Sequence, residues 1–405
     1  MCLNRVIVVG GSVAGLRAVE TLRQEGFDGE VMLVGGESHL PYDRPPLTKQ
    51  ILTGELAAEQ LYYRDLEWFE RNEVELCLGT TASALDVQSS VLQVGKRSLR
   101  FDGLIIATGA QPRRLARTAG LAGIYTLRTI EDALTVKEQM LPGVRLIIIG
   151  AGFIGSEVAS SAAACGVQVT ILEVADSAMT RAVGPQLGRV LGALHDEFGV
   201  STVCNARVVG FGGSDRVESV HLEGGWELPA DIVVMGIGIS PNTGWLASSG
   251  LTISDGMVCD ENLNAGPDNV FGAGDVVAWP NDWWGGVMRG EQWLVAAEQG
   301  RHAARNLLAG PGNATRFSTV PYFWSDQYGC RIQAAGRTDL GELITLAGEL
   351  RQRPYVGAFR YEGRLTGVVA INAPKEFAGL RQALQTNSSF DAAVATIETQ
   401  LKAVD

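Results

Sequence analysis

A strand, a glycine turn, a helix and a second strand follow one another twice in this chain, and this repeat limits the possible folds more than any other feature. Residues 6–37 read VIVVGGSVAGLRAVETLRQEGFDGEVMLVGGE, two apolar runs joined by a glycine turn and an amphipathic stretch. Residues 146–173, LIIIGAGFIGSEVASSAAACGVQVTILE, repeat that order. Each pattern is typical of a β-α-β unit. Two copies predict two nucleotide-binding domains of the α/β class.

The second copy carries the more complete glycine fingerprint. Gly150, Gly152 and Gly155 have the spacing G-x-G-x-x-G directly after the apolar run. The first glycine allows a tight turn, the second lets the backbone approach a pyrophosphate, and the third lets the helix pack on the strand. Glu173 ends the next apolar run, where a carboxylate accepts hydrogen bonds from a ribose 2′-hydroxyl and repels a 2′-phosphate. We therefore predict a dinucleotide site that prefers NADH over NADPH.

The first copy reads GGSVAG and differs at one position, because Ser12 stands between Gly10 and Gly15 where the middle glycine is expected. Serine is small and its hydroxyl can bond a phosphate. We expect a second nucleotide to bind here.

Three further apolar runs end in polar or glycine turns. DGLIIATGA ends at Thr108 and Gly109, DIVVMGIG ends at Gly238, and DNVFGAGD ends at Gly274 and Asp275. A carboxylate at such a turn can bond the hydroxyls of a ribityl chain, and the glycine before it lets the backbone come close. The alternative for Asp275 is a helix N-cap, and the two roles can coexist.

The segment PYDRPPLTKQIL, residues 41–52, is stiffened by two adjacent prolines. Proline restricts its own φ and disfavours the helical region for the residue before it, so we expect Arg44 and the next residue to be non-helical. A helix is expected to begin at residue 47 or 48, with Lys49 in its first turn. A cation there opposes the helix dipole, which suggests a role outside the helix; the alternative is a solvated surface lysine.

Composition excludes several classes of protein. The 405 residues carry a net charge of −12, which argues against a general binder of nucleic acids or anionic membranes. The start of the chain shows no signal-peptide pattern, so we expect a cytoplasmic protein. The cysteines include no C-x-x-C pair, and the four histidines suggest no metal site. Disulfide reductases of related architecture need such a dithiol and are disfavoured.

Five motifs give the chain a strong resemblance to one family. With them the chain resembles, over almost its whole length, the FAD-dependent NADH:ferredoxin reductases of bacterial oxygenase systems. The motifs are PYDRPPLTK (41–49), GAGFIGSE (150–157), VFGAGD (270–275), AAEQGR (296–301) and PYFWSDQYGCRIQAAG (321–336).

The resemblance implies a glutathione-reductase-like fold of two Rossmann-like domains and a C-terminal α+β domain. The expected FAD-binding domain is formed by residues 1–110 and 245–319, the NADH-binding domain by 111–244, and the C-terminal domain by 320–405. In the last, YVGAFRY and RLTGVVAIN are expected to form a hairpin, followed by a helix over PKEFAGLRQALQ.

The resemblance also assigns roles to side chains. It implies that Arg44 lies near the FAD phosphates, that Lys49 pairs with Glu157 beside the flavin ring, and that Trp293 and Trp324 lie at the flavin, although core packing is the alternative for both tryptophans. The residues expected to bind FAD or NADH are Gly10, Ser12, Ala14, Gly15, Glu37, Arg44, Lys49, Ala82, Thr108, Gly109, Gly150, Gly152, Ile154, Gly155, Glu173, Gly238, Gly274, Asp275, Trp293 and Trp324.

Two positions depart from the family pattern. The chain reads Gly36-Glu37 where the family usually has two acidic residues, or an aspartate and one neighbouring residue. Val295 stands where the family usually has an asparagine. Both changes are expected to loosen FAD binding or to shift its potential.

The implied reaction is hydride transfer from NADH to FAD, followed by single-electron transfers to a ferredoxin, in a monomer or weak homodimer. Because the chain is acidic, docking of an acidic ferredoxin needs a local basic surface, for which Arg301, flanked by Arg289 and Arg331, is the candidate. The alternative is that these arginines pair with Glu291 and Glu298. Two other functions remain open: a ferredoxin-independent oxidase or tailoring flavoenzyme, and an NADH-sensing flavoprotein of the apoptosis-inducing-factor type.

Overall fold

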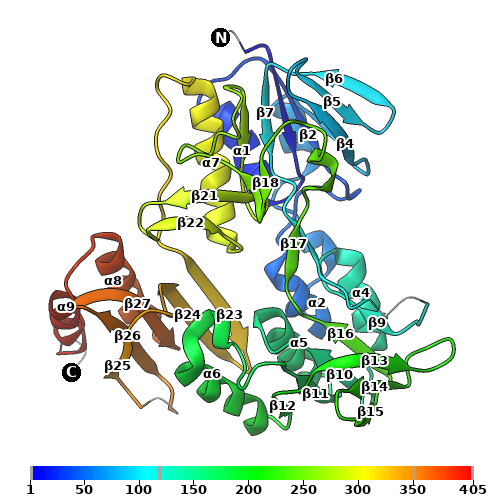
Figure 1. Cartoon of the computed structure of the whole chain (residues 1–405), viewed down its shortest axis with the longest axis vertical. Coiled ribbons are helices and arrows are strands. Elements are labelled where there is room, and N and C mark those ends of the chain that lie inside the picture. The colour runs from blue at the N-terminus through cyan, green and yellow to red at the C-terminus, as the bar shows by residue number, and fades with distance from the viewer. Residues whose placement is uncertain (1–2, 117–119, 350–351, 403–405) are drawn as a thin grey trace. The chain divides into compact units, whose positions relative to one another are not determined.

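A computed structural model describes residues 3–116, 120–349 and 352–402 of the chain (Figure 1). These residues form two compact units. The predicted three-domain division stays a prediction, although the segment 44–60 groups here with the second unit. Unit 1 comprises Met1–Asp43, Leu61–Gln111 and Ser240–Pro321, and unit 2 comprises Arg44–Gln60, Pro112–Ile239 and Tyr322–Asp405.

Unit 1 is built on a five-stranded parallel sheet with the strand order β20-β7-β1-β2-β3. Its inner strands are apolar and almost completely buried, as a parallel sheet covered on both faces requires. Helix α1 (Val13–Gln24) packs against α7 (Trp293–Ala309) so closely that a Cβ added to Gly300 would lie 2.1 Å from the carbonyl oxygen of Ala14. The strands are β1 (Arg5–Val9), β2 (Glu30–Val34), β3 (Val74–Cys77), β7 (Gly103–Ile106) and β20 (Val270–Gly272).

Two smaller sheets and two short helices also belong to unit 1. One sheet is the antiparallel β4–β6 meander, and the other has the order β18-β19-β21-β22. Their strands are β4 (Ala82–Asp86), β5 (Val91–Val94), β6 (Arg97–Arg100), β18 (Ile253–Ser254), β19 (Gly256–Val258), β21 (Val277–Asn281) and β22 (Gly286–Arg289); the helices are α3 (Leu66–Arg71) and η3 (Gly244–Leu246). The 3-10 helix η2 (Ala58–Leu61) has its first three residues in unit 2 and its last in unit 1.

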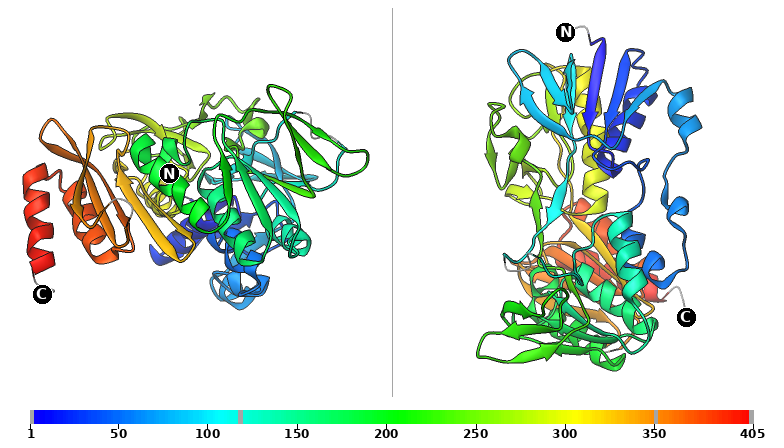
Figure 2. Two further views of the ribbon diagram at one scale, coloured as in Figure 1. Left: turned by 90° about the horizontal axis from the view of Figure 1, so that it is seen from below. Right: turned by 90° about the vertical axis from the view of Figure 1, so that its right-hand side faces the viewer.

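Unit 2 repeats the parallel architecture with the strand order β12-β11-β10-β16-β9. Helix α5 (Phe153–Ala164) follows the glycine turn, as α1 does in unit 1. A small antiparallel sheet, β13–β15, adds to this part, and Figure 2 gives two further views of these strands. The other elements are α4 (Ile130–Gln139), α6 (Thr180–Glu197), β9 (Ile124–Tyr125), β10 (Arg145–Ile149), β11 (Gln168–Leu172), β12 (Ser201–Val203), β13 (Val208–Gly212), β14 (Ser219–Leu222), β15 (Glu227–Pro229) and β16 (Ile232–Met235). The short strands β8 (Ala110–Pro112) and β17 (Ile239–Pro241) each have residues in both units.

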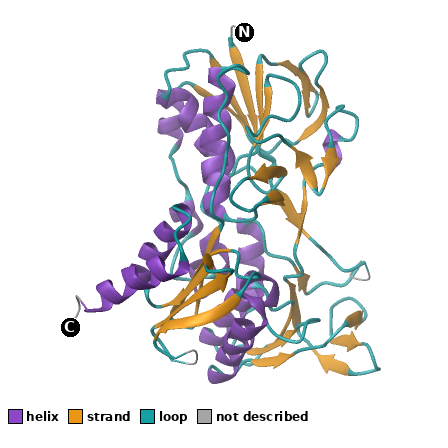
Figure 3. Ribbon diagram, turned by 60° about the vertical axis from the view of Figure 1, so that its left-hand side comes forward, coloured by secondary structure: helices purple, strands orange, loops and turns teal. Residues whose placement is uncertain are grey.

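The C-terminal part of unit 2 is a five-stranded antiparallel sheet with the order β23-β24-β27-β26-β25. The predicted hairpin is confirmed, because β26 and β27 pair across the turn at Glu362 and Gly363. The predicted helix is α8, which is followed by α9 at the C-terminal end (Figure 3). The elements are β23 (Tyr322–Gln327), β24 (Cys330–Gly336), β25 (Glu342–Ala347), β26 (Tyr355–Tyr361), β27 (Arg364–Ile371), α8 (Pro374–Gln385) and α9 (Phe390–Lys402).

The proline segment differs from the prediction. A 3-10 helix, η1 (Pro45–Thr48), begins at the first proline, and Arg44 before it has helical backbone angles (φ −85°, ψ −33°). Proline tolerates the first helical position because no hydrogen bond from its nitrogen is needed there. Lys49 lies outside regular helix, between η1 and the short α2 (Gln50–Thr53), with φ −124° and ψ −100°.

The predicted fold class is therefore confirmed: two parallel Rossmann-like sheets and a C-terminal α+β part. Within the described ranges, every helix is too short or too polar to cross a lipid bilayer.

Candidate functional site

The glycine turn of unit 1 requires glycine at two positions. Gly10 has φ 131°, and a Cβ there would lie 2.0 Å from the carbonyl oxygen of Ala107. A Cβ on Gly15 would lie 1.9 Å from the carbonyl oxygen of Gly10. The backbone of β1 thus passes directly under the start of α1, whose N-cap is Ser12. The exposed N–H groups at this helix start suit a pyrophosphate.

The glycine turn of unit 2 has the same construction. Gly150 has φ 100°, and a Cβ on Gly155 would lie 2.0 Å from the carbonyl oxygen of Gly150. At Gly152, by contrast, no heavy atom lies within 4 Å of an added Cβ. Gly152 therefore faces open space, where the protein backbone is expected to contact the pyrophosphate of a dinucleotide. Ile154, two residues on, is 39% exposed in the first turn of α5.

The two candidate ribose carboxylates follow β2 and β11. Glu173 is buried, and its carboxylate accepts hydrogen bonds from the backbone N–H groups of Ala151 (2.7 Å) and Ala175 (2.9 Å). Glu37 accepts a hydrogen bond from the hydroxyl of Tyr42 (2.6 Å). Each carboxylate oxygen has a second lone pair, so both residues retain acceptor capacity for a ribose.

The turn between β20 and β21 shows that the helix-cap alternative for Asp275 is wrong. No helix begins there among the described residues, because the chain continues directly into β21. Gly274 has φ 79°, and its N–H donates to Oε1 of the fully buried Gln299 on α7 (2.8 Å). Nε2 of Gln299 is buried without a hydrogen-bond partner in the described part of the chain. A buried, unused amide donor behind this turn fits a polar ligand in unit 1.

Two hydrogen bonds in unit 1 were not predicted from the sequence. The side-chain amide of Asn242 donates to the carbonyl oxygen of Thr108 (2.9 Å), and the Thr108 hydroxyl donates to the carbonyl oxygen of Asn242 (3.1 Å). This pair holds the backbone before Gly109, which has φ 64°. Ala82, one of the residues expected to bind FAD or NADH, pairs with Val94 between β4 and β5.

Trp293 is the first residue of α7 and is held by the proline segment. Its indole N–H donates to Oδ1 of Asp43 (3.0 Å) and to the hydroxyl of Tyr63 (2.9 Å), and that hydroxyl donates to the same carboxylate oxygen (2.6 Å). Burial, and then the charge of Asp43, raise the pKa of Tyr63. Asp43 and Tyr63 were not predicted from the sequence. The only sequence feature that pointed to Asp43 is its place within the proline segment, directly after Tyr42.

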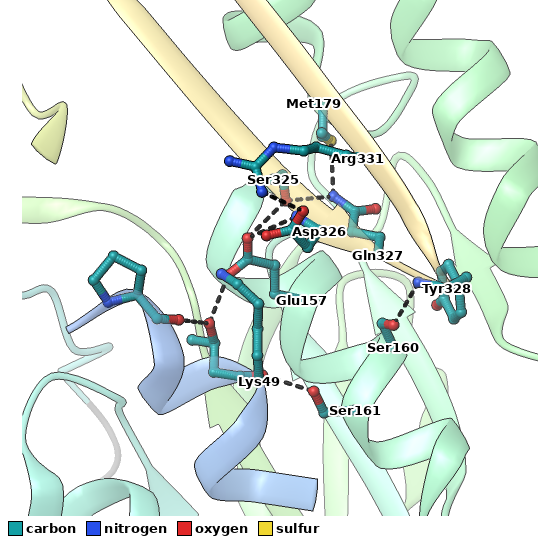
Figure 4. Close-up of polar contacts among 12 residues, drawn as sticks. Lys49, Glu157, Ser160, Ser161, Met179, Ser325, Asp326, Gln327, Tyr328 and Arg331 are labelled. Carbon is teal, nitrogen blue, oxygen red and sulfur yellow. Dashed lines mark hydrogen bonds and ion pairs between the residues drawn. The ribbon is translucent and has the colours of Figure 1, made fainter. Parts of the chain in front are cut away.

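Lys49 and Glu157 form the ion pair that the resemblance implies (Figure 4). The Lys49 ammonium lies 2.7 Å from Oε2 of Glu157, and the hydroxyl of Thr48 donates to the same oxygen (2.5 Å). The other oxygen, Oε1, accepts from the hydroxyl of Ser325 (2.8 Å) and from the N–H of Asp326 (3.3 Å). The carboxylate is buried, and four donors surround it.

The remaining predicted site residues of unit 2 lie elsewhere. The guanidinium of Arg44 donates to the carbonyl oxygen of Arg128 (2.5 Å). Trp324 on β23 stacks against Tyr322 with a ring separation of 5.9 Å, and the guanidinium of Arg331 lies 5.8 Å from its ring centre. Gly238 follows β16 with φ 99°.

Comparison with known proteins places the chain in a family. Residues 4–300 match the pyridine nucleotide-disulphide oxidoreductase model, and residues 322–404 match the reductase C-terminal model. The chain belongs to the pyridine nucleotide-disulphide oxidoreductase family. It is 33% identical over 393 residues to the ferredoxin reductase component of chlorobenzene dioxygenase from Cupriavidus sp. (strain PS12), covering 96% of this chain and 94% of that one.

Two further comparisons concern putidaredoxin reductase. The chain is 34% identical over 384 residues to putidaredoxin reductase CamA from Pseudomonas putida, covering 92% of this chain and 90% of that one. It also matches the crystal structure of the covalent putidaredoxin reductase–putidaredoxin complex, with a TM-score of 0.92, 30% identity and 99% of each chain covered.

Family membership makes the protein an oxidoreductase that uses FAD and NADH. The residues of this chain fit both groups. Each unit has one glycine turn at the start of a helix, which suits a dinucleotide pyrophosphate. In unit 1 the buried amide of Gln299 has an unused donor for a ligand, and in unit 2 the backbone at Gly152 leaves space for one.

The three arginines proposed for docking differ in their surroundings. Arg289 is ion-paired with Asp255 (3.3 Å) and Glu291 (2.7 Å), and only 10% of its side chain is exposed. No carboxylate of the described residues lies within 4.0 Å of Arg301, so the expected alternative pairing with Glu298 is wrong for it. Glu298 instead accepts a hydrogen bond from a threonine hydroxyl. Arg331 lies 3.5 Å from Asp326 and is 48% exposed.

Proposed function

We propose that this protein passes electrons from NADH, through FAD, to a small [2Fe-2S] ferredoxin that serves an oxygenase. The observation that carries the proposal is the likeness to putidaredoxin reductase over 99% of both chains, together with the buried Lys49–Glu157 pair. When bound, FAD accepts a hydride from NADH and delivers electrons singly to a one-electron carrier.

In this proposal each glycine turn holds one dinucleotide. The turn of unit 1, with Ser12 at its centre, binds the FAD pyrophosphate, and Asp275 bonds the ribityl chain. The turn of unit 2 binds NADH, and Glu173 accepts a hydrogen bond from its ribose. Glu173 favours NADH over NADPH, because a carboxylate fixed by two backbone N–H groups cannot move away from a 2′-phosphate without losing them.

Lys49 is proposed to place a positive charge at the flavin ring. An ammonium there favours electron uptake by the ring, because it offsets the negative charge that the ring gains. Glu157 fixes the direction of the lysine side chain. No side chain is needed as a general base, since hydride transfer moves the proton and both electrons together.

Docking of the ferredoxin is proposed to use Arg301. Arg301 keeps its charge available, whereas two acids neutralise Arg289. We also propose a cytoplasmic location, since all five cysteines that the structure describes are free thiols, as a reducing compartment favours.

Steady-state cytochrome c reduction with and without an added [2Fe-2S] ferredoxin tests this function. We expect turnover to depend on ferredoxin and to fall as the salt concentration rises. The Arg301→Glu substitution should raise the KM for ferredoxin about tenfold. Reduction of the flavin by NADH is expected to be unchanged. Arg305→Glu is the matched control, because Arg305 lies on the same helix and is already paired with Glu25 (2.8 Å).

Equal turnover with and without ferredoxin would favour the oxidase alternative. Negligible turnover with either acceptor, combined with normal NADH binding, would favour an NADH-sensing role. Indifference to both salt and Arg301→Glu would show that the docking surface lies elsewhere.

A further inference from the structure

The two oxygens of the Glu157 carboxylate are held by two different segments. Oε2 takes its donors from the proline segment, through Thr48 and Lys49. Oε1 takes its donors from β23 of the C-terminal sheet, through Ser325 and Asp326. Figure 4 shows the Lys49 and Ser325 side chains approaching the carboxylate from different sides. The C-terminal sheet thus fixes the half of the carboxylate that the lysine does not.

A second buried side chain determines where the Ser325 proton points. Nε2 of Gln327 donates to the Ser325 hydroxyl oxygen (2.9 Å), so that the single hydroxyl hydrogen is left for Glu157. Ser325 is fully buried and Gln327 is 1% exposed. With the amide reversed, an oxygen would face the hydroxyl and compete with Glu157 for its one proton, which disfavours that orientation.

We propose that Ser325, oriented by Gln327, is a positioning residue for the Lys49–Glu157 pair. The proposal rests on the function given above to Lys49. Without the serine hydroxyl, Oε1 keeps only the longer Asp326 N–H contact of 3.3 Å. The torsion that turns a carboxylate group is soft, so the orientation of this group depends on its hydrogen bonds. The carboxylate then rotates, and the ammonium that follows it leaves its place.

The expected loss is that of one hydrogen bond to a charged group. Ser325→Ala should slow flavin reduction by NADH roughly tenfold and lower the flavin midpoint potential, since less positive charge is held at the ring. Ser325→Thr keeps the hydroxyl and should restore most of both. In a Lys49→Met background, Ser325→Ala should have little further effect, because the group it positions is gone.

Ser160→Ala is the matched control. The Ser160 hydroxyl on α5 accepts a hydrogen bond from the N–H of Tyr328, at the turn of the β23–β24 hairpin (2.7 Å), and no contact with Glu157 is involved. This change loosens the same hairpin against the same helix. It should leave the rate of flavin reduction and the potential near those of the unmodified protein.

The decisive experiment combines three measurements on the full-length FAD-bound protein. They are stopped-flow reduction by NADH, the midpoint potential by titration, and the rate at which an amine-reactive acetylating reagent modifies Lys49, read by peptide mass spectrometry. Acetylation of Lys49 should rise several-fold in Ser325→Ala and remain unchanged in Ser160→Ala.

The outcomes separate this proposal from the proposed function. Three results would overturn the positioning role. The acetylation rate of Lys49 could be unchanged in Ser325→Ala, or it could change equally in Ser160→Ala. Alternatively, Ser325→Ala could slow flavin reduction as much in the Lys49→Met background as in the unmodified protein. If Lys49→Met itself leaves flavin reduction unchanged, the function given to Lys49 is wrong. The acetylation rate then still decides whether Ser325 positions the pair.

Discussion

Replacing Glu157 by glutamine should strongly destabilise unit 2, although the side chain keeps its shape. The carboxylate accepts from four donors, two on each oxygen. A glutamine has one carbonyl oxygen and one NH₂ group, so either the Lys49 ammonium or the Asp326 N–H must face another donor, whereas a hydroxyl can rotate and accept. If the NH₂ group turns toward Oε2's position, it meets Thr48 and the Lys49 ammonium; if it turns the other way, it meets Ser325 and Asp326.

The expected cost follows from the burial of the pair. Only 8% of the Glu157 side chain and 13% of the Lys49 side chain are exposed. Removing one partner of a buried ion pair costs about 3 to 5 kcal/mol, because the remaining charge is left without compensation. Since Lys49 keeps some contact with water, we expect about 3 kcal/mol, near the lower limit. For a unit of roughly 200 residues this lowers Tm by about 6 to 12 °C.

Thermal unfolding followed by circular dichroism tests this estimate. The double variant Glu157→Gln/Lys49→Met should be more stable than Glu157→Gln alone, because no buried charge is left. Glu157→Asp serves as a control that keeps the charge but shortens the side chain. A Tm for Glu157→Gln within about 2 °C of the unmodified protein, or strictly additive losses in the double variant, would refute the reasoning.

Two other expectations follow from the geometry. Gly155→Ala should destabilise the protein by about 1 to 3 kcal/mol, since its Cβ would lie 2.0 Å from the Gly150 carbonyl oxygen. Gly152→Ala, whose Cβ meets open space, should leave Tm unchanged and raise the KM for NADH. Equal losses of Tm in the two variants would contradict this expectation. Burial lowers the pKa of His195 to about 4, so the unfolded chain binds more protons than the folded one between pH 6.5 and 4, and stability should fall by about 3 kcal/mol as pH drops through that window. His195→Gln should remove this dependence in pH-dependent melting curves.

The two parallel sheets could be predicted because their signals are local. Each apolar run is long enough to be buried on both faces, and each glycine triplet marks one turn. The structure explains the triplets by clashes: Gly10 and Gly150 have positive φ, and Cβ atoms at Gly15 and Gly155 would overlap the preceding backbone. The positive φ values and the clashes at Gly15 and Gly155 arise within a few residues, so a local sequence pattern indicates them. The clash of a Cβ on Gly10 with Ala107 is not local and could not be predicted.

The missed residues of the candidate site act over long separations. Ser325 is 168 residues from Glu157, and Trp293 is 250 residues from Asp43. No local pattern distinguishes such a serine or aspartate from an ordinary polar residue, because its partner is known only once the sheets have been placed. The prediction for the proline segment failed for a different reason: the bias against helical angles before proline is modest, and Arg44 adopts such angles at the start of a 3-10 helix despite it.

The conformation of the proline segment determines the backbone position of Lys49. A lysine in the first turn of a helix would be unfavourable beside the positive end of the helix dipole. Because η1 ends at Thr48 and α2 begins at Gln50, Lys49 is the capping residue between the two short helices and has neither helical nor extended backbone angles. This break allows Thr48 and Lys49, adjacent in sequence, to reach the same oxygen of Glu157. The two prolines therefore begin η1 and do not exclude helix, and Lys49 directly follows the end of this short helix.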